Sequence, residues 1–420
     1  MGLQRFFIIA GFALFFIAVQ LVTLYGCYNI FRSFKSNKKT RIAALAYILF
    51  LNLSYLFLFY RYPLPAELKT TINHILIYPY FIYMLLCLVL FPWFVLSGLF
   101  VSMNKLWTEV TMLLGYDSNK NTAGPEGRRE FLKVATSALL LPVGGCSLYG
   151  TYIGRNRIAI EEQTLSFPDL PEALDGLSIV QISDLHAGAF MEGWQLEPFI
   201  EIVNNLKPDI VVITGDIISW GSYYIEPVTE VLGKIRSSRG VYAIMGNHDF
   251  YGDIDALCES LEKSGITVLR NKWEKLDFFS EASPLYLIGV DDVWATRYFK
   301  KRNISLRDII SGIPERSFKL LLSHNPILFD EAAAHGIHLT LSGHTHAGQI
   351  IFPFPQDHGY SFARLIYKRD YGLYRTGDSF LYINRGLGVI GPPLRINCPR
   401  EITRIVLKSS LHEKGGCRSG

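Results

Sequence analysis

Three long uncharged runs near the start of the chain constrain its fold more than any other feature. They cover residues 6–31, 42–60 and 75–103, and none contains Asp, Glu, Lys or Arg. Each is long enough for a helix across the hydrocarbon core of a bilayer, which takes about 20 residues. A fourth run, 134–153, is less apolar and contains Pro142 and three glycines. We therefore expect an α-helical membrane region of about four spans, with residues 1–104 holding the first three.

The balance of charge divides the chain into two parts. The 420 residues include 41 Lys and Arg and 37 Asp and Glu, a net charge of +4. Residues 1–153 carry a net charge of +8, whereas residues 154–420 carry −4. The second part lacks the excess of Lys and Arg that binding to a phosphate backbone requires. We expect no nucleic-acid binding.

Basic residues between the predicted spans indicate the topology. The gap 32–41 holds five Lys or Arg, the gap 61–74 holds two, and the segment 105–133 holds five. The positive-inside rule then places the first and third loops in the cytoplasm. This predicts a multi-pass protein of the plasma (inner) membrane, with the domain after Ile153 on the extracytoplasmic side. The lipid bilayer is its first expected partner.

The lack of ionisable residues inside the predicted spans argues for an anchor. The spans contain Gln20, Asn29 and Asn52, but no Asp, Glu, Lys or Arg. Transporters and proton relays usually keep ionisable groups at membrane depth. We therefore favour an anchor over a transporter.

The segment 105–133 is expected to be a cytoplasmic linker with an export signal. Its residues Gly127–Lys133 include Arg128 and Arg129 and resemble a twin-arginine motif, which would make the twin-arginine translocase a partner during export. The alternative is ordinary positive-inside anchoring. The segment 134–153 would be a fourth helix or a signal-anchor. A faint likeness to a lipoprotein box at Cys146 leaves open whether it is cleaved or lipidated.

The remainder of the chain is typical of an α/β domain, which we place at residues 154–408, with a flexible tail at 409–420. Short apolar runs alternate with stretches of helical period, so we expect a sheet buried by helices. Eight runs are predicted as strands: 177–183, 210–214, 241–245, 285–290, 318–322, 338–341, 381–384 and 402–407.

Carboxylate, amide and imidazole side chains follow five of these predicted strands. The carboxyl ends of strands in an open α/β sheet converge on one crevice, so these side chains are expected to meet. Imidazole and carboxylate without thiolate suit Mn, Zn, Fe, Co or Ni, and the set is too large for one tetrahedral ion. We therefore expect two divalent metal ions. The candidate residues are Asp184, His186, Asp216, Asn247, His248, Asp249, His324, His344 and His346.

The five blocks that hold these residues resemble the motifs of the calcineurin-like metallophosphoesterase family. They read Ser-Asp-Leu-His, Gly-Asp, Gly-Asn-His-Asp, Ser-His and Gly-His-Thr-His, and the likeness covers about residues 177–407. The resemblance implies a four-layer αββα sandwich. It also implies one metal held by Asp184, His186, Asp216 and His346. A second metal would be held by Asp216, Asn247, His324 and His344, with Asp216 bridging.

The same resemblance implies catalytic roles for His248 and Asp249. His248 would face the phosphoryl group without ligating metal, and Asp249 would orient it. Two cations would neutralise the phosphate and activate a bridging water as hydroxide, while the imidazole assists departure of the leaving oxygen.

The last part of the domain resembles membrane-anchored and twin-arginine-exported phosphodiesterases, some of which act on lipid A-like glycolipids. Segments 343–351 and 384–402 carry this likeness. Arg385, Arg395 and Arg364 are candidate substrate contacts. Residues 350–375 combine aromatic and basic side chains, so they either grip a lipid phosphate at the interface or pack into the core.

The leading hypothesis is a membrane-anchored dimetal phosphoesterase that hydrolyses a phosphodiester or pyrophosphate, with a phosphorylated small molecule or lipid as substrate. One alternative is a phosphodiesterase for soluble or cyclic nucleotides. Another is a metal-binding scaffold without turnover.

Overall fold

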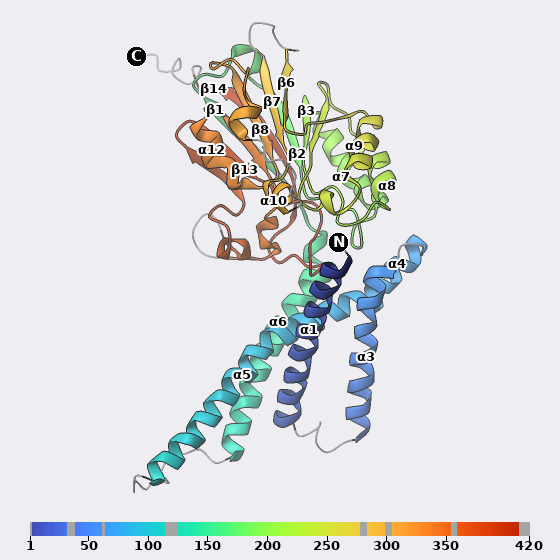
Figure 1. The fold of residues 1–420 in the computed structure, drawn as a ribbon, viewed down its shortest axis with the longest axis vertical. Helices are drawn as coiled ribbons and strands as arrows, with labels where there is room; N and C mark the ends of the chain where they lie inside the picture. Colours follow the sequence, from blue (N-terminus) through green and yellow to red (C-terminus); the bar gives the residue numbers. More distant parts are fainter. Residues whose placement is uncertain are drawn as a thin grey trace, which may run out of the picture. The chain divides into compact units, whose positions relative to one another are not determined.

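The structure is a computed structural model that describes residues 2–31, 38–60, 64–113, 125–277, 284–298, 305–353 and 359–410. The chain forms two compact units (Figure 1). We call Met1–Thr151 the helical unit and Tyr152–Gly420 the sheet unit. This boundary lies two residues before the one predicted from the sequence.

The helical unit contains a helix at each of the four predicted spans. Its elements are α1 Gly2–Ile30, α3 Lys38–Tyr60, α4 Ala66–Ile72, the π-helical turn η1 Asn73–Ile77, α5 Tyr78–Leu113 and α6 Pro125–Tyr152. The described parts of the predicted linker 105–133 are helical, because α5 extends to Leu113 and α6 begins at Pro125.

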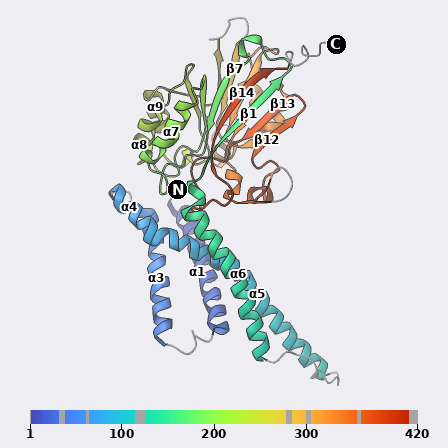
Figure 2. The ribbon, with the colours of Figure 1, turned by 180° about the vertical axis from the view of Figure 1, so that it is seen from behind.

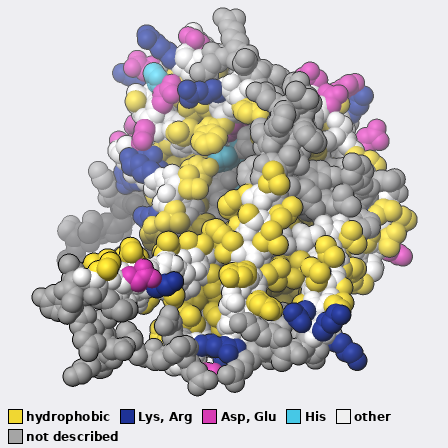
Figure 3. Space-filling view, turned by 60° about the horizontal axis from the view of Figure 1, so that its bottom comes forward, with side chains coloured by type: hydrophobic (Ala, Val, Ile, Leu, Met, Phe, Trp, Pro, Cys, Tyr) yellow, Lys and Arg dark blue, Asp and Glu magenta, His cyan; other side chains and the backbone are white. Residues whose placement is uncertain are grey.

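Two stretches of the described residues are long and apolar enough to cross a membrane, namely Glu67–Val110 and Arg129–Asn156. The described side chains of α1 and α3 supply shorter apolar stretches, Leu14–Ile30 and Arg41–Ser54. Of the four predicted spans, the third and the fourth are therefore long and apolar enough in the described residues. Hydrophobic side chains form a broad exposed surface (Figure 3), and Leu96 is one of those that α5 exposes.

Polar side chains join the helices to one another. Gln20 on α1 and Asn52 on α3 exchange two amide hydrogen bonds of 3.1 and 2.9 Å. The Arg129 side chain on α6 donates through Nε to the carbonyl oxygen of Ile30, at 3.0 Å. A cation at this end of α1 satisfies a free carbonyl and complements the helix dipole. One arginine of the predicted export motif therefore has a folding role, and export itself stays a prediction.

The sheet unit contains two six-stranded mixed sheets (Figures 1 and 2). The first has the order β1 Ile158–Phe167, β14 Arg400–Ser409, β2 Ser178–Ile182, β3 Ile210–Thr214, β4 Val241–Ile244, β5 Ile266–Val268. The second has the order β12 Gly372–Thr376, β13 Ser379–Ile383, β9 Leu339–Ser342, β8 Phe318–Ser323, β7 Leu285–Val290, β6 Lys272–Leu276. A small hairpin joins β10 Ile351–Phe352 to β11 Tyr360–Ser361.

The core lies between the two sheets, and alternation along the strands creates it. On β8, Phe318 and Leu320 belong to the cluster shared with the first sheet, whereas Leu321 packs with the helices outside. On the first sheet, α7 Glu197–Asn205, α8 Ile225–Leu232 and α9 Ile254–Lys263 gather on one side (Figure 1). On the second, α11 Leu306–Ile309 and α12 Phe329–Ala334 pack against the outer face. The α/β sandwich is therefore confirmed.

All eight predicted strands lie in these sheets, but several others escaped prediction. The longest is β1, which pairs in parallel with β14 over ten residues. Polar residues Glu161–Thr164 occupy its middle, and its first seven residues are exposed or only partly buried, so it lacks the continuous apolar signal of the inner strands. Its last residue, Phe167, is fully buried, with the rings of Phe318 and Phe380 each 5.1 Å away.

We predict that Phe167→Ala lowers the free energy of unfolding of the full-length chain by about 3–5 kcal/mol, because it removes a buried aromatic side chain. Denaturant unfolding in detergent measures this. The matched control is Ile160→Ala on the same strand, whose side chain is 49% exposed. It should change the free energy by about 0.5 kcal/mol or less. Equal losses would show that β1 does not pin the inter-sheet core.

Candidate metal centre

The predicted metal ligands lie in five loops at one end of the sheet unit. Strands β2, β3 and β4 are parallel neighbours in the first sheet, as are β7, β8 and β9 in the second. The loops that follow β2, β3, β4, β8 and β9 carry the five motifs. We call this end of the sheet unit, at the carboxyl ends of these strands, the site end.

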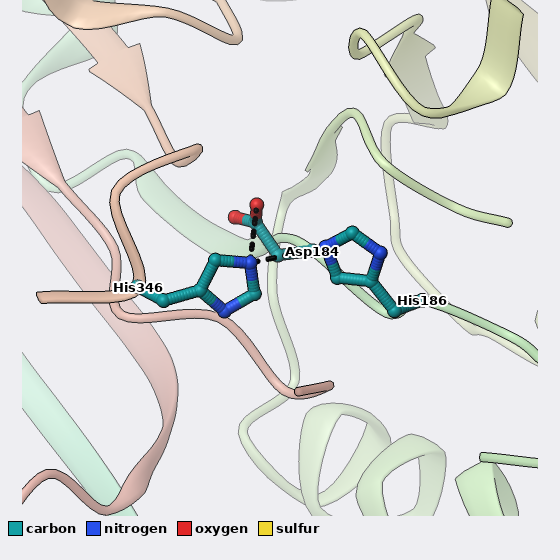
Figure 4. Close-up of side chains that lie close together, drawn as sticks. All are labelled: Asp184, His186 and His346. Carbon is teal, nitrogen blue, oxygen red and sulfur yellow. Dashed lines mark hydrogen bonds and ion pairs between the residues drawn. The ribbon is translucent and has the colours of Figure 1, made fainter. Parts of the chain in front are cut away.

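One cluster comprises Asp184, His186 and His346, all buried (Figure 4). Asp184 Oδ1 lies 3.2 Å from His346 Nε2, and the two imidazole Nε2 atoms of His186 and His346 lie 3.0 Å apart. The carboxylate also accepts the backbone N–H of His344, at 3.0 Å. One strand end of each sheet therefore contributes to this cluster.

The other cluster comprises Asp216, His324 and His344. Asp216 Oδ2 lies 3.2 Å from His324 Nε2, which lies 3.2 Å from His344 Nδ1. The same Asp216 oxygen lies 3.4 Å from His186 Nε2 in the first cluster. Asp216 is thus placed where one carboxylate can serve both clusters.

The donor atoms fit two divalent ions. Nitrogen and oxygen donors without sulfur suit Mn, Zn, Fe, Co or Ni. Imidazole nitrogens face each other in both clusters, an arrangement that a shared cation stabilises. Asn247 Oδ1 is buried without a hydrogen-bond partner, and a buried carbonyl oxygen of this kind calls for a ligand.

The backbone of the clusters is strained in a way that suits a functional site. Asp184, His186, Asp216, His344 and His346 all have positive φ values, between 48° and 72°. Non-glycine residues rarely adopt this conformation, and such residues cluster at active sites. The strain turns five donor side chains inward, so we read it as part of the site's construction.

Two glycines in the motifs allow the donors to approach. A Cβ atom on Gly246 would lie 2.2 Å from Asp216 Oδ1, and one on Gly343 would lie 2.2 Å from Asp184 Oδ2. Any larger residue at either position would displace a carboxylate.

Burial and neighbouring charges shape the electrostatics. Burial disfavours ionised Asp184, but the charges of His346 and His324 outweigh it and hold the pKa of Asp184 below its ordinary value. Burial lowers the pKa of His344 to about 4, with a contribution from the charge on His324. Both residues therefore favour the deprotonated forms that bind metal.

His248 lies beside both clusters without joining either. Its backbone N–H donates to Asp216 Oδ1 at 2.7 Å, and its imidazole Nδ1 lies 3.0 Å from the carbonyl oxygen of Ser219. A carbonyl only accepts, so Nδ1 carries a proton and Nε2 remains available for a reacting group.

The expected orientation of His248 by Asp249 needs correction. The Asp249 carboxylate accepts the backbone N–H groups of Gly246 and Ile218, at 2.8 and 2.9 Å. It therefore braces the loops after β3 and β4, and the carbonyl of Ser219 orients the imidazole. Burial, with the charge on Asp216, raises the pKa of Asp249 to about 7.

Sequence reasoning missed two residues at this site. The Tyr367 hydroxyl lies 3.0 Å from His344 Nε2. Asp292 is buried with Oδ2 unpartnered, and its charge contributes to raising the pKa of His324. A signal for Asp292 was present, because it follows the predicted strand 285–290 as the metal-site residues follow theirs. Nothing in the sequence ties Tyr367 to His344.

Two of the three predicted substrate arginines are structural. Arg395 is fully buried and donates to the carbonyl oxygens of Arg385, Gly386 and Gly388, so it is not available to a substrate. Arg385 is buried and paired with Glu161 and Glu401. The prediction of substrate binding is wrong for Arg395 and Arg385, because both guanidinium groups are buried and already bonded to carbonyl or carboxylate oxygens of the fold. Arg364 is exposed, with its guanidinium 5.9 Å from the Tyr360 ring.

The sequence pattern of calcineurin-like phosphoesterases matches residues 177–348, which contain all five motifs. An uncharacterised metallophosphoesterase of Bacillus subtilis is 34% identical over 67% of this chain and 98% of its own length. This chain belongs to the calcineurin-like metallophosphoesterase family. It is a metal-dependent phosphoester hydrolase.

Two further relatives bear on the helical unit of this metallophosphoesterase. A zebrafish (Danio rerio) "transmembrane protein with metallophosphoesterase domain" is 32% identical over 63% of this chain and 60% of its own length. An uncharacterised metallophosphoesterase of Helicobacter pylori is 28% identical over 93% of this chain and 97% of its own length. The second similarity covers so much of the chain that it includes most of the helical unit.

We predict that Asp216→Ala removes at least one of two bound metal ions per chain, because both clusters share this carboxylate. Metal analysis of protein purified with Mn in excess measures the content. His335→Ala, which changes a histidine at the end of α12, is the control and should retain two ions. Two ions retained by Asp216→Ala would contradict the shared position.

Proposed function

We propose that this chain is a membrane-anchored dimetal phosphoesterase that hydrolyses a phosphodiester or pyrophosphate bond of a lipid, such as a phospholipid or a lipid A-like glycolipid. The observation that carries the proposal is the pair of clusters joined at Asp216, with a free imidazole nitrogen beside them. Two metal clusters that share one carboxylate suit phosphoryl transfer, because charge builds up on both the attacking and the leaving oxygen.

Seven residues would hold the ions and an eighth, His248, would transfer a proton. Asp184, His186, Asp216 and His346 would hold one ion, and Asp216, Asn247, His324 and His344 the other. Bound ions would supply charge neutralisation for the phosphoryl oxygens and a more acidic water. His248 is held by the carbonyl of Ser219, and we assign it the proton given to the leaving oxygen through Nε2.

Several features support a site near lipid. The two apolar stretches long enough to cross a membrane support an anchor, and so does the name of the zebrafish relative, a transmembrane protein. The basic first and third loops support an extracytoplasmic sheet unit in a multi-pass protein. An exposed Arg364 beside apolar side chains suits a lipid phosphate, and it is the one substrate arginine that we retain.

We predict that the purified chain with Mn hydrolyses bis-p-nitrophenyl phosphate and that His248→Ala lowers kcat by about 10²–10⁴-fold, as expected for loss of a general acid. Metal content should not change, because His248 belongs to neither cluster. His335→Ala is the matched control and should keep full turnover. A variant His248→Ala that loses its metal would contradict the assigned role, and no turnover with any divalent ion would favour a scaffold.

The active chain and the variant His248→Ala also test the class of substrate. Lipid extracts of cells that make the active chain are compared with those of cells that make His248→Ala. A phospholipid or glycolipid should be depleted only by the active chain. Unchanged lipids, together with turnover of cyclic nucleotides, would favour the soluble substrate.

A further inference from the structure

Exposed hydrophobic side chains of the sheet unit are distributed unevenly. Among the described residues from Ile158 onward, fourteen large hydrophobic residues are exposed, and all fourteen lie at the site end. Trp194, Trp220 and Trp294 lie in the segments that follow β2, β3 and β7, and Ile158 lies at the start of β1. The described loops at the opposite end contain no exposed large hydrophobic residue. Gathering of this kind marks an interaction surface.

The densest part of this surface is the segment Tyr360–Tyr367. Leu365 and Ile366 are 65% and 77% exposed, and Phe362 is 49% exposed. Arg364 in the same segment is exposed too. Apolar tips flanked by a cation are the composition of elements that insert into the headgroup region of a bilayer.

Two polar contacts connect this segment and the residues that follow it to the metal centre. The Tyr367 hydroxyl lies 3.0 Å from His344 Nε2. Thr345, between His344 and His346, donates a hydrogen bond to the carbonyl oxygen of Asp370. The exposed tips at Leu365 and Ile366 are therefore at the rim of the metal centre, two residues or fewer from a side chain that contacts it.

The membrane helix also enters the sheet unit at the site end. α6 ends at Tyr152 and β1 begins at Ile158, a link that spans about 20 Å at most. β1 is parallel to β14, and β14 is antiparallel to β2, so the start of β1 lies at the carboxyl end of β2. Arg400 Nε donates to the carbonyl oxygen of Arg155 at 2.5 Å and fixes the link there.

The link is close to the metal centre as well. Glu161 on β1 pairs with Arg385, and the next residue, Gly386, packs against Asp184. A Cβ atom on Gly386 would lie 2.7 Å from the Asp184 Cβ atom. The link that follows α6, the exposed apolar residues and the metal centre therefore lie at one end of the sheet unit.

We propose that the site end docks onto the surface of the membrane that anchors the chain, with Leu365 and Ile366 inserted among the lipids. This inference rests on the membrane anchor of the proposed function and deepens it. The occupant is the lipid monolayer, because the short link from α6 to β1 holds the site end near the membrane. Trp and Tyr side chains also favour the membrane–water interface. The enzyme would take a phosphorylated lipid from the bilayer without releasing it into water.

Site-specific photo-crosslinking tests the docking in the full-length chain. The substitution Ile366→p-benzoylphenylalanine is reconstituted in vesicles of phosphatidylethanolamine and phosphatidylglycerol and irradiated, and adducts are identified by mass spectrometry. The control places the same residue at Asp378, whose side chain is 78% exposed in the β12–β13 turn at the opposite end. We expect a lipid adduct at 366 that is at least tenfold more abundant than at 378.

A second variant guards against non-specific labelling. Leu365→Asp should lower the yield of lipid adduct at 366 at least fivefold while two metal ions stay bound, which shows that the fold persists. Equal lipid yields at 366 and 378, or no lipid adduct at 366, would overturn the docking. An adduct with a second copy of the chain would overturn it as well and would identify a self-interface.

Failure of the docking and failure of the proposed function are distinguishable, because crosslinking needs no turnover. A chain that crosslinks to lipid but does not hydrolyse bis-p-nitrophenyl phosphate would contradict the function alone. An active chain without the adduct would contradict the docking alone.

Discussion

The structure depends on one buried carboxylate, that of Asp216. Its Oδ2 atom lies within 3.4 Å of His186 from the first sheet and within 3.2 Å of His324 from the second. Its Oδ1 atom accepts the backbone N–H of His248. Burial of a carboxylate costs several kcal/mol unless charge and hydrogen bonds compensate. Asp216 therefore joins the loops of the two sheets at the site end and links the two clusters.

Strain and burial at the centre are the cost of holding ligands together. Five donor residues have left-handed backbone conformations, and neither Gly246 nor Gly343 has room for a side chain. These features would be unfavourable in an ordinary loop. The large inter-sheet core below, with Phe167 and Phe318 at its centre, provides the stability that tolerates them.

The metal-site residues and the inner strands were easier to predict from the sequence than the edge strand β1, for physical reasons. Inner strands are buried on both faces, so β3 and β7 appear in the sequence as continuous apolar runs with the same bounds that the structure gives. Side chains that follow such strands must converge, and six of the predicted metal-site residues do so in two clusters. In contrast, β1 has four polar residues in its middle, Glu161–Thr164, and is buried only near its end, so it gives no continuous apolar run.

Long-range contacts also decide what an arginine does. Arg395 was predicted as a substrate contact in a segment that resembles those of exported phosphodiesterases, but it is buried against three carbonyl oxygens. Asp249 likewise braces two loops rather than the neighbouring imidazole. A sequence records which residues are polar, whereas their partners depend on the tertiary fold. The exposed Leu365 and Ile366 are the reverse case, apolar residues that the fold leaves uncovered.

Electron paramagnetic resonance of the chain loaded with Mn²⁺ tests the shared carboxylate most directly. Two ions joined through Asp216 would lie about 3.5–4 Å apart, close enough for magnetic exchange. We predict the multiline spectrum of a coupled pair at two Mn²⁺ per chain. A six-line spectrum of isolated Mn²⁺ at that loading would contradict a centre built around Asp216.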